Sequence, residues 1–186
     1  MANWSKGSAD NLDHCDSCLM QIKSLDESFS LIGNWLFTRE DLPENKNIDL
    51  DTAQWKLTKA PGSWANVYKD HKPSRIGWYR GVFEFDPSLI GQEVVFLLDA
   101  YMGKITFYLD EVEIYKRPNN KNIEKYYSIQ PIPITFKVTK LKHVVAFRVD
   151  SPLMTGVYQL PFKLKKFDSR DISIAWYQFG GGKLGL

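Results

Sequence analysis

The stretch Gly77-Trp78-Tyr79-Arg80-Gly81-Val82-Phe83-Glu84-Phe85-Asp86-Pro87 decides the fold of this chain. It begins at a glycine and ends at Asp-Pro, and such residues punctuate secondary structure. Between these ends the aromatic side chains Tyr79, Phe83 and Phe85 occupy alternate positions. This alternation is typical of a half-buried β-strand. We predict a strand whose aromatic face builds a core, while its other face, which carries Trp78, Arg80 and Glu84, is mostly sheet scaffolding.

Length and composition allow one domain with a real core, because the chain has 186 residues and 44% hydrophobic content. The formal net charge of +2 argues against a dedicated nucleic-acid binder, which normally carries a clustered basic face. No apolar run approaches the roughly 20 residues that span a bilayer, and the N-terminus lacks the apolar core of a signal peptide. Two interpretations stay open: a cytoplasmic protein, or a piece of a protein whose targeting and membrane segments lie elsewhere.

Short alternating or apolar segments fill the chain, with turns between them and no convincing interior helix. The expected strands are 31–37, 55–57, 77–87, 93–100, 104–109, 112–115, 126–129, 132–138, 143–150, 157–167 and 172–179. The nearly apolar run 93–100 predicts a central strand covered on both faces. The pattern predicts an all-β, antiparallel sandwich or barrel. We expect a partly ordered N-terminal arm over 1–28, the β-sandwich domain over 29–179 and a flexible tail over 180–186.

The two cysteines, Cys15 and Cys18, form a single Cys-x-x-Cys. A zinc module would need a second pair of ligands, and none follows. The pair is interpreted as a local disulfide or as two free thiols in a mobile arm, with metal binding as a weaker alternative.

No catalytic constellation is evident, since the chain has no nucleophile elbow and no phosphate loop. His14, His71 and His143 are far apart in the sequence, and the carboxylates are scattered, with Asp99 and Asp150 at strand ends. The sequence therefore predicts a non-enzymatic fragment without a cofactor. It shows no defined calcium-loop spacing, so a structural calcium ion has no support.

Several short motifs together resemble the galactose-binding-domain-like jelly roll. Their order is Gly33-Asn34-Trp35-Leu36-Phe37, the Trp55 to Trp64 step, Gly77-Trp78-Tyr79-Arg80, Phe107-Tyr108-Leu109-Asp110 and Val145-Ala146-Phe147-Arg148-Val149-Asp150. Two branches are similar: the sugar-binding domain of glycoside hydrolase family 2 enzymes, and the extracytoplasmic domain of bacterial seven-transmembrane receptors with diverse intracellular signalling modules. The likeness covers roughly residues 31 to 165.

One hairpin departs from the family pattern. The family usually has Asn-Gly there, which supplies the positive φ angles of a tight primed turn. This chain has Asp110-Glu111 instead. Because a glutamate resists that geometry, we expect a turn of another type or a longer one.

The resemblance implies a jelly-roll β-sandwich that acts as a non-enzymatic sensor for a small-molecule or carbohydrate-type ligand. It would lie on the periplasmic or extracellular side of the cytoplasmic membrane, as part of a membrane-anchored bacterial signalling protein with a cyclase, diguanylate cyclase or kinase output. The alternative is a sugar-binding accessory domain of a glycoside hydrolase family 2 enzyme. A third interpretation is a structural or dimerising domain, a homodimer without a small ligand.

The resemblance also places the ligand on loops at one end of the sandwich. Aromatic rings beside charged hydrogen-bonding groups suit a sugar, which has apolar ring faces edged with hydroxyls. The candidate ligand contacts are Trp64, Arg75, Tyr101, Tyr158 and Arg80. Structural alternatives exist for two of them: Trp64 as a cap on the sandwich, and Arg80 as a partner of a carboxylate across the sheet.

Overall fold

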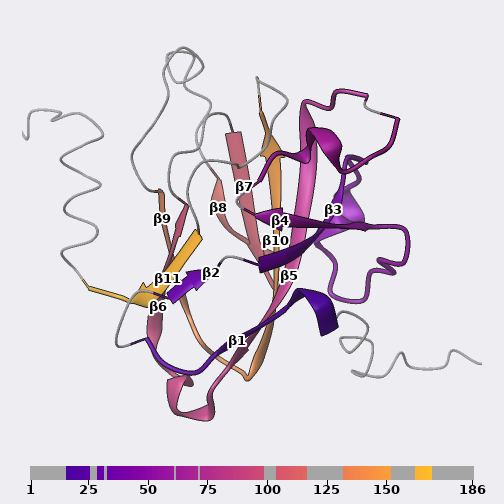
Figure 1. The fold of residues 1–186 in the computed structure, drawn as a ribbon. Coiled ribbons are helices and arrows are strands. Elements are labelled where there is room, and N and C mark those ends of the chain that lie inside the picture. The colour runs from indigo at the N-terminus through magenta and orange to yellow at the C-terminus, as the bar shows by residue number, and fades with distance from the viewer. Residues whose placement is uncertain are drawn as a thin grey trace, which may run out of the picture.

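A computed structural model describes residues 16–25, 29–31, 33–60, 62–70, 72–98, 104–116, 132–151 and 162–168. Its strands form two sheets that face each other across a core (Figure 1). The larger sheet contains, in spatial order, β4 (Lys56–Ala60), β3 (Gly33–Thr38), β5 (Ile76–Phe85), β10 (Lys142–Asp150), β7 (Lys104–Leu109) and β8 (Val112–Lys116). The smaller sheet contains β2 (Phe29–Leu31), β11 (Phe162–Lys166), β6 (Glu93–Leu98) and β9 (Ile132–Lys137). The predicted antiparallel sandwich is confirmed.

The quoted stretch forms β5, the strand with the most neighbours in the larger sheet. It pairs antiparallel with β10 along nearly its whole length and with β3 over residues 78–80. Where β3 no longer borders β5, the strand β1 (Leu19–Ile22) pairs with that edge of β5, in parallel orientation, over residues 82–85. Because β5 borders these three strands, its alternating pattern fixes which residues face the core across the centre of the sheet.

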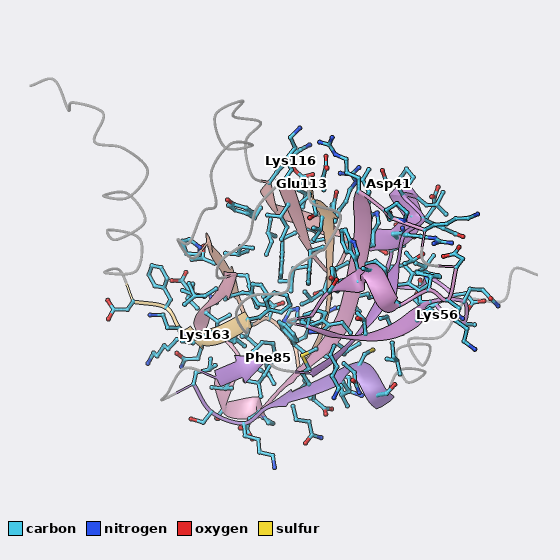
Figure 2. The ribbon with its side chains drawn as sticks, turned by 45° about the horizontal axis from the view of Figure 1, so that its top comes forward. Asp41, Lys56, Phe85, Glu113, Lys116 and Lys163 are labelled. Carbon is cyan, nitrogen blue, oxygen red and sulfur yellow. The ribbon has the colours of Figure 1, made fainter. Side chains whose placement is uncertain are left out.

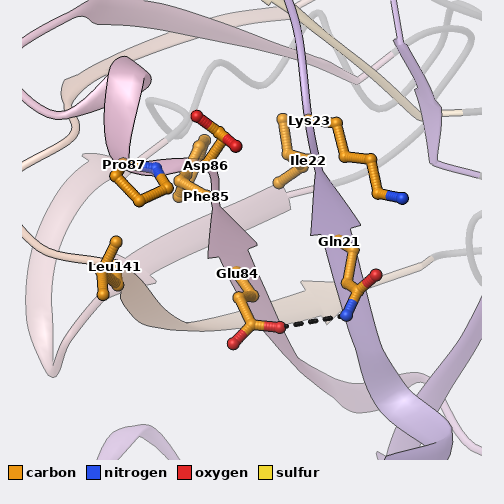
Figure 3. Close-up of a pocket in the computed structure, with 8 residues that line it drawn as sticks. All are labelled: Gln21, Ile22, Lys23, Glu84, Phe85, Asp86, Pro87 and Leu141. Carbon is orange, nitrogen blue, oxygen red and sulfur yellow. Dashed lines mark hydrogen bonds between the residues drawn. The ribbon is translucent and has the colours of Figure 1, made fainter.

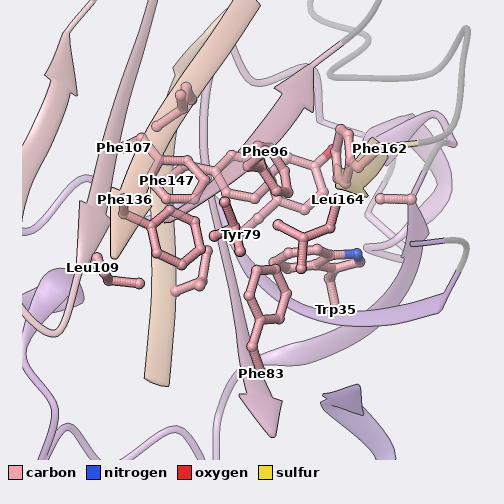
Figure 4. Packing of buried hydrophobic residues seen from close by; sticks show 14 of the residues in the cluster. Trp35, Tyr79, Phe83, Phe96, Phe107, Leu109, Phe136, Phe147, Phe162 and Leu164 are labelled. Atoms are coloured by element: carbon pink, nitrogen blue, oxygen red, sulfur yellow. The ribbon is translucent and has the colours of Figure 1, made fainter. Parts of the chain in front are cut away.

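Aromatic rings fill the space between the two sheets (Figure 4). Tyr79 of β5 stacks on Phe147 of β10, with centroids 4.9 Å apart, and Phe96 of β6 approaches Phe107 of β7 at 4.9 Å. Aromatic pairs of this kind contribute about 0.5–1.5 kcal/mol each beyond the area that they bury. The predicted core face of β5 is therefore confirmed.

Strand β6 is buried on both faces, as its apolar sequence predicts. Val94, Val95 and Phe96 are consecutive, so their side chains alternate between the two faces of the sheet, and each is 0% exposed.

Part of the predicted N-terminal arm belongs to the sandwich. Residues 19–22 form β1, and the side chains of Ile22 and Leu25 join the core. A main-chain hydrogen bond also links this segment to the sandwich, because the Asp86 N–H donates to the Ile22 carbonyl at 2.9 Å. Cys18 is buried at 1% exposure and is disulfide-bonded. Its pairing with Cys15 stays a prediction, since Cys15 lies outside the described residues.

The β7–β8 hairpin corrects one expectation. Asp110 and Glu111 form a two-residue turn with φ of 47° and 72°, the positive values that a primed turn needs. Tertiary hydrogen bonds hold both residues in place. The Asp110 carboxylate accepts from the Val144 N–H at 2.9 Å and contacts His143 Nδ1 at 2.6 Å, and Glu111 Oε1 accepts from the Ile48 N–H at 2.5 Å. These bonds offset the unfavourable backbone geometry, so Asn-Gly is not required.

The helices in the described residues are short 3-10 turns. They are η2 (Asp16–Cys18), η3 (Pro43–Lys46), η4 (Trp64–Asn66) and η5 (Pro87–Leu89). In this part of the chain no helix has the length and apolar character that crossing a membrane requires. The expected strands at 126–129 and 172–179, most of the N-terminal arm and the 180–186 tail lie outside the described residues.

Candidate ligand-binding site

A group of polar and aromatic side chains lies on the outer face of the larger sheet, where β10 ends and β5 begins. Strand register brings them together: Arg148 of β10 lies between Thr106 of β7 and Trp78 of β5. Two residues further along, Asp150 lies on the same face of β10, because side chains alternate along a strand.

An ion pair with two hydrogen bonds forms the centre of this group. Arg148 Nε and one terminal nitrogen donate to the two carboxylate oxygens of Asp41, each at 2.7 Å. The Trp78 indole N–H donates to the same carboxylate at 3.0 Å. The bonds from Arg148 and then Trp78 lower the pKa of Asp41 despite some burial, and Asp41 in turn raises the pKa of Arg148. The side chains of Asp41 and Arg148 remain 39% and 29% exposed, so solvent or a ligand can reach the pair.

Two aromatic rings lie beside the ion pair. Trp78 and Tyr108 stack with centroids 5.6 Å apart and an interplanar angle of 18°. They come from the strands on either side of β10, where Tyr108 pairs with Ala146 and Trp78 pairs with Arg148. Trp78 is only 2% exposed, whereas Tyr108 is partly exposed and has the Lys46 ammonium 5.7 Å from its ring centroid. Partial burial raises the pKa of Tyr108, which keeps its hydroxyl protonated at neutral pH.

A second ion pair extends the group towards the end of the sheet. Arg75 Nε donates to Asp150 Oδ1 at 2.5 Å, and the Ser151 N–H donates to the Arg75 carbonyl at 2.8 Å. The Arg75 side chain is 52% exposed. We call the six residues Arg75, Asp150, Arg148, Asp41, Trp78 and Tyr108 the outer strip. Figure 2 shows Asp41 in the upper part of the molecule, the side on which Glu113 and Lys116 of β8 also lie.

Arg80 lies on the same outer face of β5 as Trp78 but is buried, so it is not a surface contact. It is 5% exposed, and its guanidinium donates to the carbonyls of Ile48 at 2.7 Å and Asn45 at 3.5 Å. Burial lowers the pKa of Arg80 to about 10. Glu111 and Asp49 act on Arg80 through their charge, but among the described residues no carboxylate forms a hydrogen bond with it. Arg80 as a ligand contact is wrong, because its side chain is buried. A buried guanidinium can serve several carbonyls at once, and here it holds the loop around η3 against the sheet.

Trp64 is a core residue, which corrects its assignment as a ligand contact. Its ring is 3% exposed and packs against Phe37 at 5.3 Å and Tyr79 at 6.0 Å. A ring that stacks on a sugar must expose one face to solvent, and the Trp64 ring is buried. The structural alternative, Trp64 as a cap on the sandwich, is therefore confirmed.

Tyr101 and Tyr158 lie outside the described residues. The strand ends on either side of them do reach the strip: Lys104, the first residue of β7, pairs with Asp150, the last residue of β10. Of the five predicted contacts, Arg75 is the one that the structure describes with an exposed side chain, and it belongs to the strip.

A hollow lies at the opposite end of β5 (Figure 3). It measures about 260 Å³, and its walls include Gln21, Glu84, Pro87 and Leu141. Gln21 Nε2 donates to Glu84 Oε2 at 3.3 Å, and Lys142 Nζ is 3.7 Å from the other carboxylate oxygen. The aromatic residue in its lining, Phe85, is only 1% exposed, so the hollow offers a sugar less ring surface than the strip does.

Sequence reasoning did not select five residues of the strip as ligand contacts: Asp41, Arg148, Asp150, Trp78 and Tyr108. A signal existed for four of them, because Arg148 and Asp150 alternate on one face of a predicted strand and Trp78 and Tyr108 lie in quoted motifs. Asp41 gave no such signal. It comes from a polar loop, and only the folded chain brings it to Arg148.

The clearly shifted pKa values among the carboxyl groups of the described residues favour the ionised form. Those whose pKa departs from the ordinary value are Asp41, Asp70, Asp86 and Asp110, and each is lowered. Glycosidic bond cleavage needs one carboxylic acid with a raised pKa that stays protonated. None of these four carboxyl groups meets that condition, and Asp41, the one in the strip, is held in the ionised form that accepts hydrogen bonds.

Comparisons with solved structures agree with this architecture. A glycosyl hydrolase family 2 member from Bacteroides cellulosilyticus has a TM-score of 0.60 and 19% identity, covering 76% of this chain and 21% of the enzyme. A β-glycosidase from Bacteroides vulgatus has a TM-score of 0.57 and 18% identity over 75% and 20% of the two chains. A Bifidobacterium dentium β-glucuronidase, complexed with coumarin-3-O-glucuronide, has a TM-score of 0.52 and 18% identity over 70% and 22%.

The fold is a galactose-binding-domain-like jelly roll. The chain spans about one fifth of the length of the enzymes it matches. No protein-family model and no curated protein matches the chain.

Proposed function

We propose that this chain is a non-catalytic, carbohydrate-binding jelly-roll domain of the kind found in glycoside hydrolase family 2 enzymes, and that its outer strip contacts the saccharide. The fold shared with these enzymes carries the proposal. The strip supplies the chemistry, because exposed Arg–Asp pairs donate and accept hydrogen bonds with hydroxyl groups while Tyr108 offers ring surface.

This is the sequence-based alternative, and it has more support than the sensor interpretation. The structural neighbours named above are glycoside hydrolases and not receptors. The sensor role, the extracytoplasmic location, the membrane anchor and the homodimer stay predictions.

The test is a binding measurement on the purified chain. Isothermal titration calorimetry against neutral and acidic mono- and oligosaccharides should detect at least one ligand with millimolar or tighter affinity. The double variant Asp41→Ala/Arg148→Ala removes one acid and one base, so the net charge is unchanged. We expect it to weaken binding at least about tenfold, the equivalent of 1.4 kcal/mol.

The matched control is Glu84→Ala/Lys142→Ala, which removes an acid and a base beside the hollow at the other end of β5. It should bind as the unmodified chain does. If only this control loses binding, the saccharide lies in the hollow and the strip is the wrong site. If no saccharide binds, the carbohydrate-binding function itself is refuted.

A further inference from the structure

The outer strip is extended, and its contact groups are separated along the sheet. Tyr108 pairs with Ala146, and the Arg75–Asp150 pair lies four residues further along β10. At about 3.3 Å per strand residue, the two corresponding backbone positions on β10 are about 13 Å apart. The Asp41–Arg148 pair lies between them, because Arg148 is midway from Ala146 to Asp150 along the strand.

These three positions offer different contacts. Tyr108, supported by stacking on Trp78, gives ring surface at one end. The two Arg–Asp pairs give charge-assisted hydrogen bonds in the middle and at the other end. Arg75 is 52% exposed and Asp41 is 39% exposed, so both ion pairs are accessible on the same side of the sheet as Tyr108.

One pyranose ring is too short to reach from Tyr108 to Arg75. We infer that the strip recognises a segment of an oligosaccharide chain, with adjacent sugar residues on Tyr108, on Arg148–Asp41 and on Arg75–Asp150, and not a single sugar. This inference rests on the proposed function, since it assigns a ligand class to the same site. The strip runs along β10 on the outer face of the larger sheet, so a bound chain would lie parallel to that strand.

The experiment combines ligand length with two variants. Calorimetry would compare one, two and three sugar units of the cello-, xylo- and galacto-oligosaccharide series. For the series that binds, we expect the trisaccharide to bind at least about tenfold more tightly than the monosaccharide, because charge-assisted bonds at two further positions add to the first contact.

The variants locate the contacts. Tyr108→Ala should weaken every ligand that binds at the aromatic end, whatever its length. Arg75→Ala should weaken the trisaccharide and leave the monosaccharide unchanged. Lys56→Ala, on the edge strand β4 away from the strip, is the control for a surface substitution and should change neither (Figure 2). Thermal melting of each variant would show that the fold is intact.

Two failures are distinguishable. If a monosaccharide binds as tightly as its trisaccharide, or Arg75→Ala weakens both equally, the oligosaccharide inference is refuted and the carbohydrate-binding function stands. If no series binds at any length, the proposed function fails, and the inference fails with it.

Discussion

Replacing Gly77 by alanine tests the central feature of this fold, the packing of Trp64 against the start of β5. A Cβ atom at Gly77 would overlap ring atoms of both Trp64 and Phe37. Neither ring has room to move, because Trp64 is 3% and Phe37 is 1% exposed and both contact Tyr79. The added methyl group therefore has to displace the core.

The magnitude follows from two opposing effects. Overpacking of a close-packed core lowers the free energy of unfolding by about 1–3 kcal/mol, and two immobile rings place Gly77→Ala near the upper limit. The loss of glycine flexibility in the unfolded chain offsets about 0.4–1 kcal/mol. We expect a net loss of about 2 kcal/mol. With a typical urea m value of about 2 kcal/mol/M, the midpoint falls by about 1 M.

Urea unfolding followed by tryptophan fluorescence measures this change. The matched control is Gly33→Ala in β3, where an added Cβ meets no atom within 4 Å. It should leave the midpoint unchanged or raise it slightly. Adding Trp64→Leu to Gly77→Ala makes room for the methyl group, so the two changes should be non-additive by about 1 kcal/mol or more.

A midpoint for Gly77→Ala as high as that for Gly33→Ala would refute this reasoning. It would mean that the Trp64 ring does not press on β5, and Trp64 would again be available as a ligand contact.

Two further predictions concern buried polar contacts. Arg80→Met keeps the apolar stem but removes the hydrogen bonds to the η3 loop. It should lower the free energy of unfolding by about 2 kcal/mol and speed amide hydrogen exchange at Ile48. Unchanged exchange at Ile48 would contradict the role of Arg80. Burial alone would raise the pKa of Asp110, but hydrogen bonds from His143 and the Val144 N–H lower this pKa below its ordinary value. The ionised Asp110 carboxylate therefore stabilises the fold above about pH 4, and this stabilisation is lost as the pH falls further. Asp110→Asn should therefore be less stable than the parent chain at pH 7, and the difference should shrink at pH 3; an equal difference at both pH values would refute this assignment.

Strand positions were predictable because they depend on local alternation. The predicted segment 104–109 coincides with β7, and the predicted strand 143–150 matches β10 apart from one residue at its start. The N-terminal strand β1 was not predicted. Its four residues carry no strict alternation, and they form a strand only because β5 offers an unpaired edge beyond β3.

The candidate site likewise contains residues that the sequence could identify and residues whose role depends on tertiary packing. Arg75 was identified from its residue type and its place before a predicted strand, and the structure puts it on the strip. Trp64 has the residue type that binds sugars, but its exposure depends on what packs around it, and here the rings of Phe37 and Tyr79 bury it. Residue type indicates which chemistry is available, whereas burial decides whether a ligand can use it.

The sequence by itself determined that this chain is an antiparallel β-sandwich, and that β5 supplies its core with alternate aromatic side chains. A period of two needs only local geometry, so it can be read without knowing any partner strand. Only the tertiary structure decided which charges meet. Asp41 and Arg148 are 107 residues apart in sequence, and their 2.7 Å hydrogen bonds exist because the β3–β4 loop folds over the sheet. The same packing turned Trp64 and Arg80 from candidate contacts into interior supports, and it holds Asp110 and Glu111 in a turn that their own backbone preferences oppose.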